Sequence, residues 1–290
     1  MRKVNIIILG STSFIGKKLL SNLKKKYQVL GFGSKQIDLT KKKELSKLNK
    51  YINPDSIILV LSANKLQKGA SIKILDQNYK MYSNLFSLLE KNIPKKIIFF
   101  SSQVVFGEYV NNNNTKENTK QIPNTYYGLS KIIGEKLLEL KFKGNKKKYT
   151  IMRLPRIYGP DDSVDNYGPT QFVYNFLQRK QIKVWGDGKE RREFIHISDV
   201  VKITELLFNS KIYGPINICS GQSYRFIDII KIIKKITGKK VNYFNANRTG
   251  DSVNHILNNS YFNKKFPNYK FKNLHTGIIE LLRDKKFIVK

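Results

Sequence analysis

The sequence predicts an α/β fold in which a doubly wound parallel sheet is followed by a smaller carboxyl-terminal lobe. Short apolar runs have the length of buried strands, and they lie at 4–9, 28–30, 56–61, 96–100, 150–154 and 215–219. Helical patterns fill most of the gaps, notably 17–26, 78–91, 127–140 and 198–208. This alternation is typical of a parallel sheet with helices on both faces. From about residue 159 the alternation loosens and Pro and Gly become frequent, which indicates the lobe.

The first strand, at 4–9, ends in a glycine-bearing turn. The turn consists of Gly10, Ser11, Thr12, Ser13, Phe14, Ile15 and Gly16, and the helical pattern follows at once. A strand, a glycine turn and a helix in this order form a Rossmann-type cradle, in which backbone N–H groups and the positive end of the helix dipole face a pyrophosphate. Ser13 stands where a further glycine is usual, and its Cβ limits how closely the backbone approaches the phosphates. We expect all seven residues to bind a dinucleotide.

The end of the second strand bears on which dinucleotide is bound. An acid at this position binds the ribose 2′-hydroxyl of NAD and repels the 2′-phosphate of NADP. Here the strand continues into Gly-Phe-Gly and then Ser34 and Lys35, with no acid before Asp38. Ser34 and Lys35 can bind a phosphate, so the sequence favours NADP, with NAD as the alternative. Asp38 and Leu39 are expected beside the adenine.

Tyr127 is the predicted proton donor and acceptor. Lys131 follows four residues later on the same helix face. A tyrosine has a pKa near 10, and lowering it by about three units requires roughly 4 kcal/mol. One ammonium group about 4 Å away, at an effective dielectric constant near 20, supplies roughly that much. We therefore expect Lys131 and the positive charge of a nicotinamide to lower the pKa of Tyr127, and Ser102 to hydrogen-bond the reacting oxygen.

Composition limits the other classes of function. Among 290 residues there are 54 basic and 21 acidic side chains, a net charge of +33, and the excess is mostly lysine spread along the whole chain. Such a charge leaves open binding to RNA or to an anionic membrane surface. The single cysteine, Cys219, fits a reducing cytoplasm. No apolar run is long enough for a membrane span, no group of residues has metal-ligand spacing, and the Asn run at 111–114 predicts a loop.

Several motifs in a fixed order resemble the extended short-chain dehydrogenase/reductases, in particular the nucleotide-sugar epimerase/dehydratase/reductase family. Beside the glycine turn and YGLSK at 127–131, they are FFSSQVVFG at 99–107, MRLPRIYGP at 152–160, WGDG at 185–188, RREFIH at 191–196 and RTGD at 248–251. The resemblance covers essentially the whole chain. It implies a Rossmann-type domain, a nucleotide-sugar substrate and a homodimer formed through helices 78–91 and 127–140.

The resemblance also assigns roles to individual residues. Ser102, Tyr127 and Lys131 become the catalytic set, and Pro155 lies in the loop on the nicotinamide side. Gln103, Arg192, Arg248 and Asp251 are implied in substrate binding, the two arginines at the diphosphate and Asp251 at the nucleotide ribose. Asn78 and Asn84 are expected to support the site. His196 is assigned a structural role, and no metal is required.

Some reactive side chains of the family are absent from this sequence, which reduces the number of reactions that the resemblance implies. Dehydratases of this family carry an Asp-Glu pair after the catalytic serine or threonine, whereas Gln103 and Val104 occupy these positions here. The cysteine and histidine that exchange carbon-bound protons in related epimerase-reductases are matched by Val104 and Gln171. Two reactions remain. One is the NADPH-dependent reduction of a 4-keto sugar nucleotide, often a 6-deoxy sugar, in polysaccharide biosynthesis, and the other is C4 epimerisation by bound NAD. The lack of an acid after the second strand favours the reductase.

These assignments predict two domains. Residues 1–160 and 190–219 are expected to form the dinucleotide-binding domain. Residues 161–189 and 220–290 are expected to form the nucleotide-sugar-binding lobe.

Overall fold

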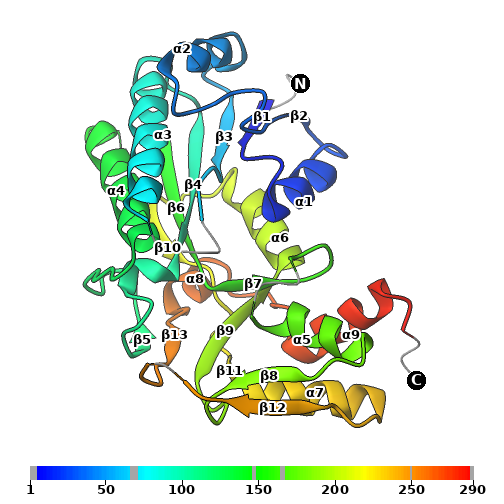
Figure 1. Cartoon of the computed structure of the whole chain (residues 1–290). Helices are drawn as coiled ribbons and strands as arrows, with labels where there is room; N and C mark the ends of the chain where they lie inside the picture. Colours follow the sequence, from blue (N-terminus) through cyan, green and yellow to red (C-terminus); the bar gives the residue numbers. More distant parts are fainter. Residues whose placement is uncertain (1–4, 66–70, 146–147, 164–166, 249, 288–290) are drawn as a thin grey trace. The chain divides into compact units, whose positions relative to one another are not determined.

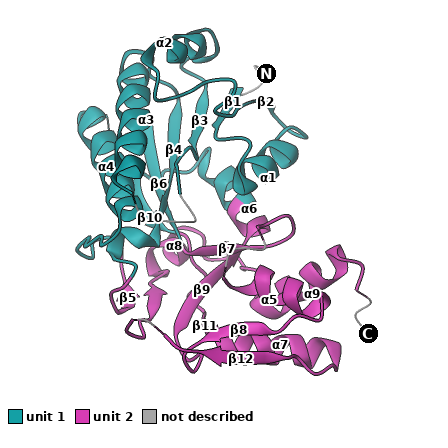
Figure 2. Ribbon diagram, in the orientation of Figure 1, with its two compact units in different colours: residues 1–108, 117–154, 201–217 teal, residues 109–116, 155–200, 218–290 magenta. Residues whose placement is uncertain are grey.

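The protein is described by a computed structural model that covers residues 5–65, 71–145, 148–163, 167–248 and 250–287 (Figure 1). It divides into two compact units (Figure 2). Unit 1 comprises Met1–Glu108, Glu117–Leu154 and Val201–Asn217, and unit 2 comprises Tyr109–Lys116, Pro155–Val200 and Ile218–Lys290. No helix in these described ranges is long and apolar enough to cross a membrane.

Unit 1 is built on a six-stranded parallel sheet with the order β10-β6-β4-β3-β1-β2. Its strands are β1 (Asn5–Leu9), β2 (Gln28–Phe32), β3 (Ile57–Val60), β4 (Lys96–Ser102), β6 (Tyr149–Leu154) and β10 (Gly214–Asn217). The predicted doubly wound sheet is confirmed, apart from residue 4, which lies outside the described residues. β1 pairs with β2 on one side and β3 on the other, so the strand order reverses at β1. Parallel sheets bind ligands at the carboxyl ends of strands at such a reversal.

The helices of the sheet unit begin and end where local chemistry dictates. They are α1 (Phe14–Leu23), α2 (Lys42–Leu45), η1 (Ser46–Tyr51), α3 (Ile72–Lys91), η2 (Gln103–Phe106), α4 (Tyr126–Lys141) and α6 (Ile197–Leu207), the last of which continues from unit 2. α3 starts six residues before the predicted residue 78 because Ser71 caps it, its hydroxyl accepting from the N–H of Lys73. In Figure 1, α3 and α4 lie side by side along the sheet.

The core of unit 1 shows why these runs form strands. Ile6, Ile7 and Ile8 of β1 are each 0% exposed, so both faces of the sheet are covered. On one face Tyr82 and Phe86 of α3 pack against Phe99 of β4, with ring centroids 5.2 and 5.9 Å apart. α4 joins this cluster at a glycine, since a Cβ on Gly134 would lie 2.6 Å from the Phe99 ring. Helix α4 therefore packs closely on the sheet.

Unit 2 has two further sheets. β5 (Asn112–Thr115), β13 (His255–Leu257), β9 (Arg191–His196) and β11 (Ser223–Arg225) form one, joined by β7 (Arg156–Tyr158), while β8 (Ile182–Trp185) pairs with β12 (Tyr243–Ala246). Its remaining helices are α5 (Pro169–Leu177), α7 (Phe226–Thr237), α8 (Ser260–Lys265) and α9 (Leu274–Asp284). Aromatic rings of Tyr167, Phe172, Phe194 and Phe226 pack between these elements.

Two expectations about the chain's organisation differ from the structure. The Asn run at 111–114 was expected to be a loop, but Asn112–Thr115 forms β5, because its backbone pairs with β13 and the Asn112 N–H donates to the Asn254 carbonyl. Residues 109–116, 155–160, 190–200 and 218–219 group with unit 2 rather than with the predicted dinucleotide-binding segments, because β9 pairs with β7, β11 and β13, and β5 pairs with β13. Which unit binds which ligand stays a prediction.

A buried ion pair fastens α4 to the sheet. Glu135 of α4, 0% exposed, accepts from Arg153 of β6 through both oxygens, at 3.1 Å from Nε and 2.7 Å from Nη2. The Ser101 hydroxyl of β4 and the Gln121 amide also donate to this carboxylate. Arg153 gives a further hydrogen bond to the Glu117 carbonyl. Every oxygen of the acid is thus used, which is the condition under which a buried pair is tolerated.

Replacing one partner of this pair is expected to destabilise unit 1. Arg153→Met leaves the Glu135 carboxylate buried without its cation, and we expect the free energy of unfolding to fall by about 3–5 kcal/mol. Lys136→Met is the matched control, because it breaks the exposed Lys136–Glu139 pair on the same helix and is expected to cost less than about 1 kcal/mol. Urea unfolding followed by circular dichroism measures both. Equal shifts for the two variants would contradict the role assigned to the buried pair.

Candidate functional site

The turn after β1 has the shape of a dinucleotide cradle. Gly10 has φ +91°, and a Cβ there would lie 2.9 Å from the backbone nitrogen of Ser62. A Cβ on Gly16 would overlap the Gly10 carbonyl and the Ser11 backbone. Only glycine fits these two positions. The two glycines thus let the turn pack against the end of β3 and let α1 start directly against the turn, which is the tight strand-turn-helix geometry of a dinucleotide cradle.

Ser13 stabilises this turn through the hydrogen bonds of its hydroxyl group. Its φ is −70°, so the position does not require glycine. The Ser13 hydroxyl donates to the Gly10 carbonyl at 2.8 Å and accepts from the Gly16 N–H at 3.1 Å. Ser13 is therefore the N-cap of α1, and the amides of the first helical turn, at Phe14 and Ile15, are directed as donors toward an anion. Thr12 and Ser13 are exposed and Ser11 is buried.

The segment after β2 places the residues predicted to select the cofactor. Ser34 and Lys35 are exposed. The Asp38 carboxylate accepts from the hydroxyl of Thr40 at 2.7 Å, and this hydrogen bond lowers the pKa of Asp38. Leu39 is 5% exposed and packs in the core of unit 1, so its side chain is not available to an adenine. If Leu39 contacts an adenine as predicted, it does so through its backbone.

Tyr127 and Lys131 lie on α4, whose first turn is fixed in two ways. Thr125 is the N-cap, accepting from the Gly128 N–H at 3.1 Å. A Cβ on Gly128 would lie 2.8 Å from the Val104 carbonyl, so glycine lets the helix approach the segment that follows Ser102. Lys131 is 2% exposed, and its Nζ donates to the Phe100 carbonyl of β4 at 2.7 Å and lies 5.7 Å from the centre of the Tyr127 ring.

The expected lowering of the Tyr127 pKa is wrong for this structure. Burial, and secondarily the negative charge of Glu108, raise the pKa of Tyr127 well above its usual value. Burial also lowers the pKa of Lys131 to about 7, against the opposing charge of Glu135. Near neutral pH the amine is therefore only partly charged, and its proton is directed at the Phe100 carbonyl. Desolvation outweighs the attraction on which the prediction was based.

Ser102 and Gln103 lie where β4 ends. Ser102 is half-buried and is the N-cap of η2, its hydroxyl accepting from the Val104 N–H at 3.4 Å. Gln103 is 6% exposed, and its side-chain oxygen is buried without a hydrogen-bond partner among the described residues. Val104 follows, so the two positions after Ser102 carry neither an acid nor a base.

Two asparagines of α3 support these segments, as expected. Asn78 is 0% exposed and donates to the Ser130 hydroxyl at 2.9 Å, which in turn donates to the Tyr127 carbonyl at 2.8 Å. The amide of Asn84 donates to the carbonyls of Leu39 and Thr40 at 3.1 and 3.0 Å. Asn78 thereby braces the helix turn of Tyr127, and Asn84 braces the segment after β2.

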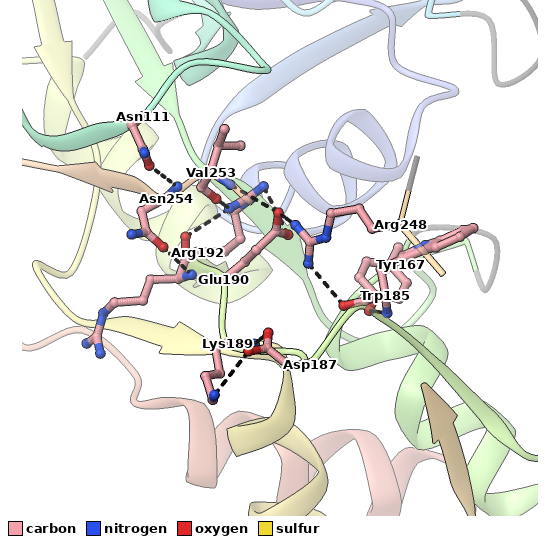
Figure 3. Close-up of polar contacts among 11 residues, drawn as sticks. Asn111, Tyr167, Trp185, Asp187, Lys189, Glu190, Arg192, Arg248, Val253 and Asn254 are labelled. Atoms are coloured by element: carbon pink, nitrogen blue, oxygen red, sulfur yellow. Dashed lines mark hydrogen bonds and ion pairs between the residues drawn. The ribbon is translucent and has the colours of Figure 1, made fainter. Parts of the chain in front are cut away.

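In unit 2 the predicted substrate-binding arginines lie together (Figure 3). Arg192, 5% exposed, donates to the Val253 carbonyl, and Arg248 donates to the Trp185 carbonyl at 3.0 Å. Both are also paired with one acid, Glu190. Asp251 is exposed, and the predicted cofactor residue Pro155 is buried.

Sequence reasoning missed three members of this cluster: Arg156, Tyr167 and Glu190. The Tyr167 hydroxyl accepts from the Trp185 N–H at 3.1 Å. Burial raises the pKa of Tyr167, while the positive charges of Arg248, Arg156 and Arg192 oppose that rise. Three arginines therefore lie close enough to act on this tyrosine. The sequence did contain one signal for Glu190, namely that it is an acid only two residues before Arg192.

His196 has the structural contacts expected of it. It is 0% exposed, its Nδ1 lies 2.8 Å from the Ser198 hydroxyl, and its ring meets the Tyr158 ring edge-on at 5.2 Å. These contacts join the end of β9 to the start of α6. No group of three or more potential metal ligands occurs in the part of the chain that the structure describes.

The glycine turn, the serine at the end of β4 and the Tyr127–Lys131 helix agree with a family model. The model for the NAD dependent epimerase/dehydratase family matches residues 6–219. The chain belongs to this family. As a member it is a nucleotide-sugar-modifying enzyme that uses a nicotinamide cofactor.

Known relatives of this family member carry several activities. GDP-L-colitose synthase of Yersinia pseudotuberculosis is 25% identical over 256 residues, covering 82% of this chain and 83% of that protein. A dTDP-4-dehydro-6-deoxy-D-allose reductase of a Streptomyces species is 24% identical over 183 residues, covering 60% of this chain but only 55% of the relative. The UDP-glucose 4-epimerase of Thermotoga maritima, solved with UDP-glucose, has the same fold, with a TM-score of 0.83, 23% identity and coverage of 97% and 98% of the two chains.

The glycine turn yields a direct test of the cradle. Gly16→Ala places a Cβ against the Gly10 carbonyl, and we expect at least a tenfold weaker affinity for NADPH and NADH, measured by isothermal titration calorimetry. Gly144→Ala is the matched control, because a Cβ there meets nothing within 4 Å. Unchanged coenzyme affinity in a folded Gly16→Ala protein would show that this turn is not the cradle.

Proposed function

We propose that this protein reduces the keto group of a 4-keto, 6-deoxy sugar linked to a nucleoside diphosphate, with NADPH as the reductant. The observation that carries the proposal is the state of Tyr127. Burial raises its pKa, so the phenol keeps its proton at neutral pH and is ready to give it to a developing alkoxide. Reduction requires a proton donor of this kind, whereas oxidation requires a base.

The side chains after Ser102 favour a simple reduction. A dehydratase needs an acid and a base there to remove water, and Gln103 and Val104 supply neither. The buried, unpartnered oxygen of Gln103 is instead suited to accept a hydrogen bond from a sugar hydroxyl. The elimination chemistry of the family therefore has no evident residues in this segment.

The segment after β2 favours NADPH over NADH. Ser34 and Lys35 are exposed where an acid would exclude the 2′-phosphate. The first acid, Asp38, already accepts from Thr40 and lies 3.5 Å from the Lys41 ammonium group. Its carboxylate is thus engaged within its own loop. A phosphate beside Ser34 and Lys35 would meet a hydroxyl donor and a cation.

The proposed reaction distributes its tasks among few residues. NADPH, when bound, supplies a hydride to the keto carbon. Tyr127 gives its phenolic proton to the keto oxygen, and the Ser102 hydroxyl donates a hydrogen bond to the same oxygen. Lys131 is proposed to hold the coenzyme ribose, while Arg192 and Arg248 bind the diphosphate as guanidinium donors.

The proposal also covers assembly and location. Exposed apolar side chains on α3 and α4 include Ile72, Tyr79, Leu129 and Leu140, at 38–69% exposure, and we assign them to a homodimer contact. Sedimentation at the mass of one 33.7 kDa chain at micromolar concentration would contradict the dimer. We also assign the protein to a reducing cytoplasm, which suits the single, buried Cys219, and to polysaccharide biosynthesis.

Removing the Tyr127 hydroxyl is expected to stop the reaction. Absorbance at the nicotinamide band follows NADPH or NADH oxidation with UDP-, GDP- and dTDP-linked 4-keto-6-deoxy sugars. Tyr127→Phe is expected to lower kcat by about 10²–10⁴-fold, with little change in coenzyme affinity. Tyr126→Phe, on the same helix but 38% exposed, is the control and should stay near wild type. Full turnover by Tyr127→Phe would refute the assignment, and tightly held NAD without coenzyme consumption would favour the C4 epimerase.

The pH profile of the wild type tests the state of Tyr127. Because the Tyr127 pKa is raised, the acid form persists as pH rises, and we expect kcat for reduction to show no alkaline loss below about pH 9. A tyrosine with the lowered pKa expected from the sequence would lose its proton, and the rate would fall between about pH 6 and 8. Steady-state kinetics across this range distinguish the two.

A further inference from the structure

One carboxylate, that of Glu190, lies between Arg192 and Arg248 of unit 2 (Figure 3). Glu190 is 8% exposed and immediately precedes β9. Its Oε1 forms an ion pair with Nη1 of Arg248, and its Oε2 lies 3.4 Å from Nη2 of Arg192. The two guanidinium groups, which come from positions 56 residues apart in sequence, are thus held by a single acid.

The surrounding backbone fixes this arrangement. Glu190 Oε1 also accepts from the Val253 N–H at 3.2 Å, and the Val253 carbonyl accepts from Arg192. Arg248 donates to the Trp185 carbonyl at 3.0 Å. Next to Trp185, Gly186 has φ +57°, and a Cβ there would lie 3.0 Å from Arg248 Nε. The arginines are therefore positioned before any ligand arrives.

Arg248 is also accessible from outside. Its side chain is 18% exposed, against 6% for Arg192. A cavity of about 590 Å³ opens at Arg248, lined also by Gly186, Asp187, Tyr243 and Asn245. A ligand that enters this cavity meets a cation that already pairs with Glu190 through Nη1 and with the Trp185 carbonyl through Nη2.

Charge then decides how an anion binds here. Arg156, Arg192 and Arg248 with Glu190 leave a net charge of +2, and a neutral side chain at position 190 would leave +3, opposite a diphosphate that carries at least two negative charges. The diphosphate and the carboxylate accept hydrogen bonds from guanidinium groups in the same way. To bind both Arg192 and Arg248, the diphosphate competes with Glu190 for guanidinium donors and lies near a buried carboxylate, and both effects cost free energy.

We propose that Glu190 is the internal counter-ion of the diphosphate site: it positions Arg192 and Arg248 in the empty site and lowers the affinity for the nucleoside diphosphate. This inference rests on the proposed function, because it takes the two arginines as the diphosphate-binding residues. Glu190 lowers the affinity for the phosphates alone, and the binding of the nucleoside part of the ligand is not affected.

Glu190→Gln tests this, because glutamine keeps the shape and one acceptor oxygen but removes the charge. We measure dissociation constants of UDP, GDP and dTDP, and of the matching nucleosides, by calorimetry and by fluorescence of Trp185, the single tryptophan of the chain. The variant is expected to bind its preferred diphosphate about tenfold more tightly, with the nucleoside affinity unchanged. Glu190→Ala, which lacks the amide, is expected to shift affinity in the same direction, so the test does not depend on one replacement folding.

Asp284→Asn is the matched control. It removes one negative charge from unit 2, but Asp284 is the last residue of α9, is 31% exposed, does not line the cavity at Arg248 and pairs with Lys285 at 3.0 Å, so we expect less than about a twofold change in diphosphate affinity. Equal or weaker diphosphate binding by Glu190→Gln, with binding lost in Arg248→Met, would overturn the inference and leave the proposed site intact. Absence of diphosphate binding in the wild type would instead contradict the proposed function, and with it the inference.

Discussion

The pairing of Glu135 with Arg153 is the interaction on which the position of α4 depends. The two charges lie on α4 and β6, and hydrogen bonds from Ser101 and Gln121 bring β4 and the loop before α4 into the same network. This network sets where α4 lies against the end of β4. Tyr127, Lys131 and Ser102 are the residues whose separation that placement determines. A buried pair contributes little net stability compared with apolar packing, so its value here is in specifying one position for the helix.

Unit 2 uses a buried acid in a related way, with a different consequence. Glu135 is paired with a single arginine inside the core, where no ligand competes for it. Glu190 is shared between two arginines, and one of these is accessible from a cavity. Glu135 therefore only positions elements of the fold. Glu190 positions two arginines and, in our proposal, also competes with the ligand for their hydrogen-bond donors. Together they connect side-chain electrostatics to both proposed parts of catalysis, proton transfer and diphosphate binding.

The sequence predicts those features that depend on local geometry. Gly10 and Gly16 are required by the turn itself, and Tyr127 and Lys131 share a helix face because they are four residues apart. Features that depend on the three-dimensional environment of a residue differ from what the sequence predicts. The pKa of Tyr127 is raised chiefly by burial, which the spacing to Lys131 does not reveal, and Leu39 packs in the core although its neighbours Asp38 and Thr40 are only partly buried. Glu190 meets Arg248 only through the fold, and β5 forms because a distant strand, β13, pairs with it.

The central claim is net hydride transfer from the coenzyme to the sugar, and isotope labelling tests it most directly. NADPH deuterated at C4 of the nicotinamide is incubated with the protein and a nucleoside diphosphate-linked 4-keto-6-deoxy sugar, and the product is analysed by mass spectrometry and NMR. The account predicts one deuterium at C4 of a 4-hydroxy sugar, with one NADPH oxidised for each product molecule. Absence of deuterium transfer and of NADPH loss with the 4-keto sugars, together with interconversion of the two C4 epimers of a 4-hydroxy sugar nucleotide, would contradict net reduction and identify an epimerase.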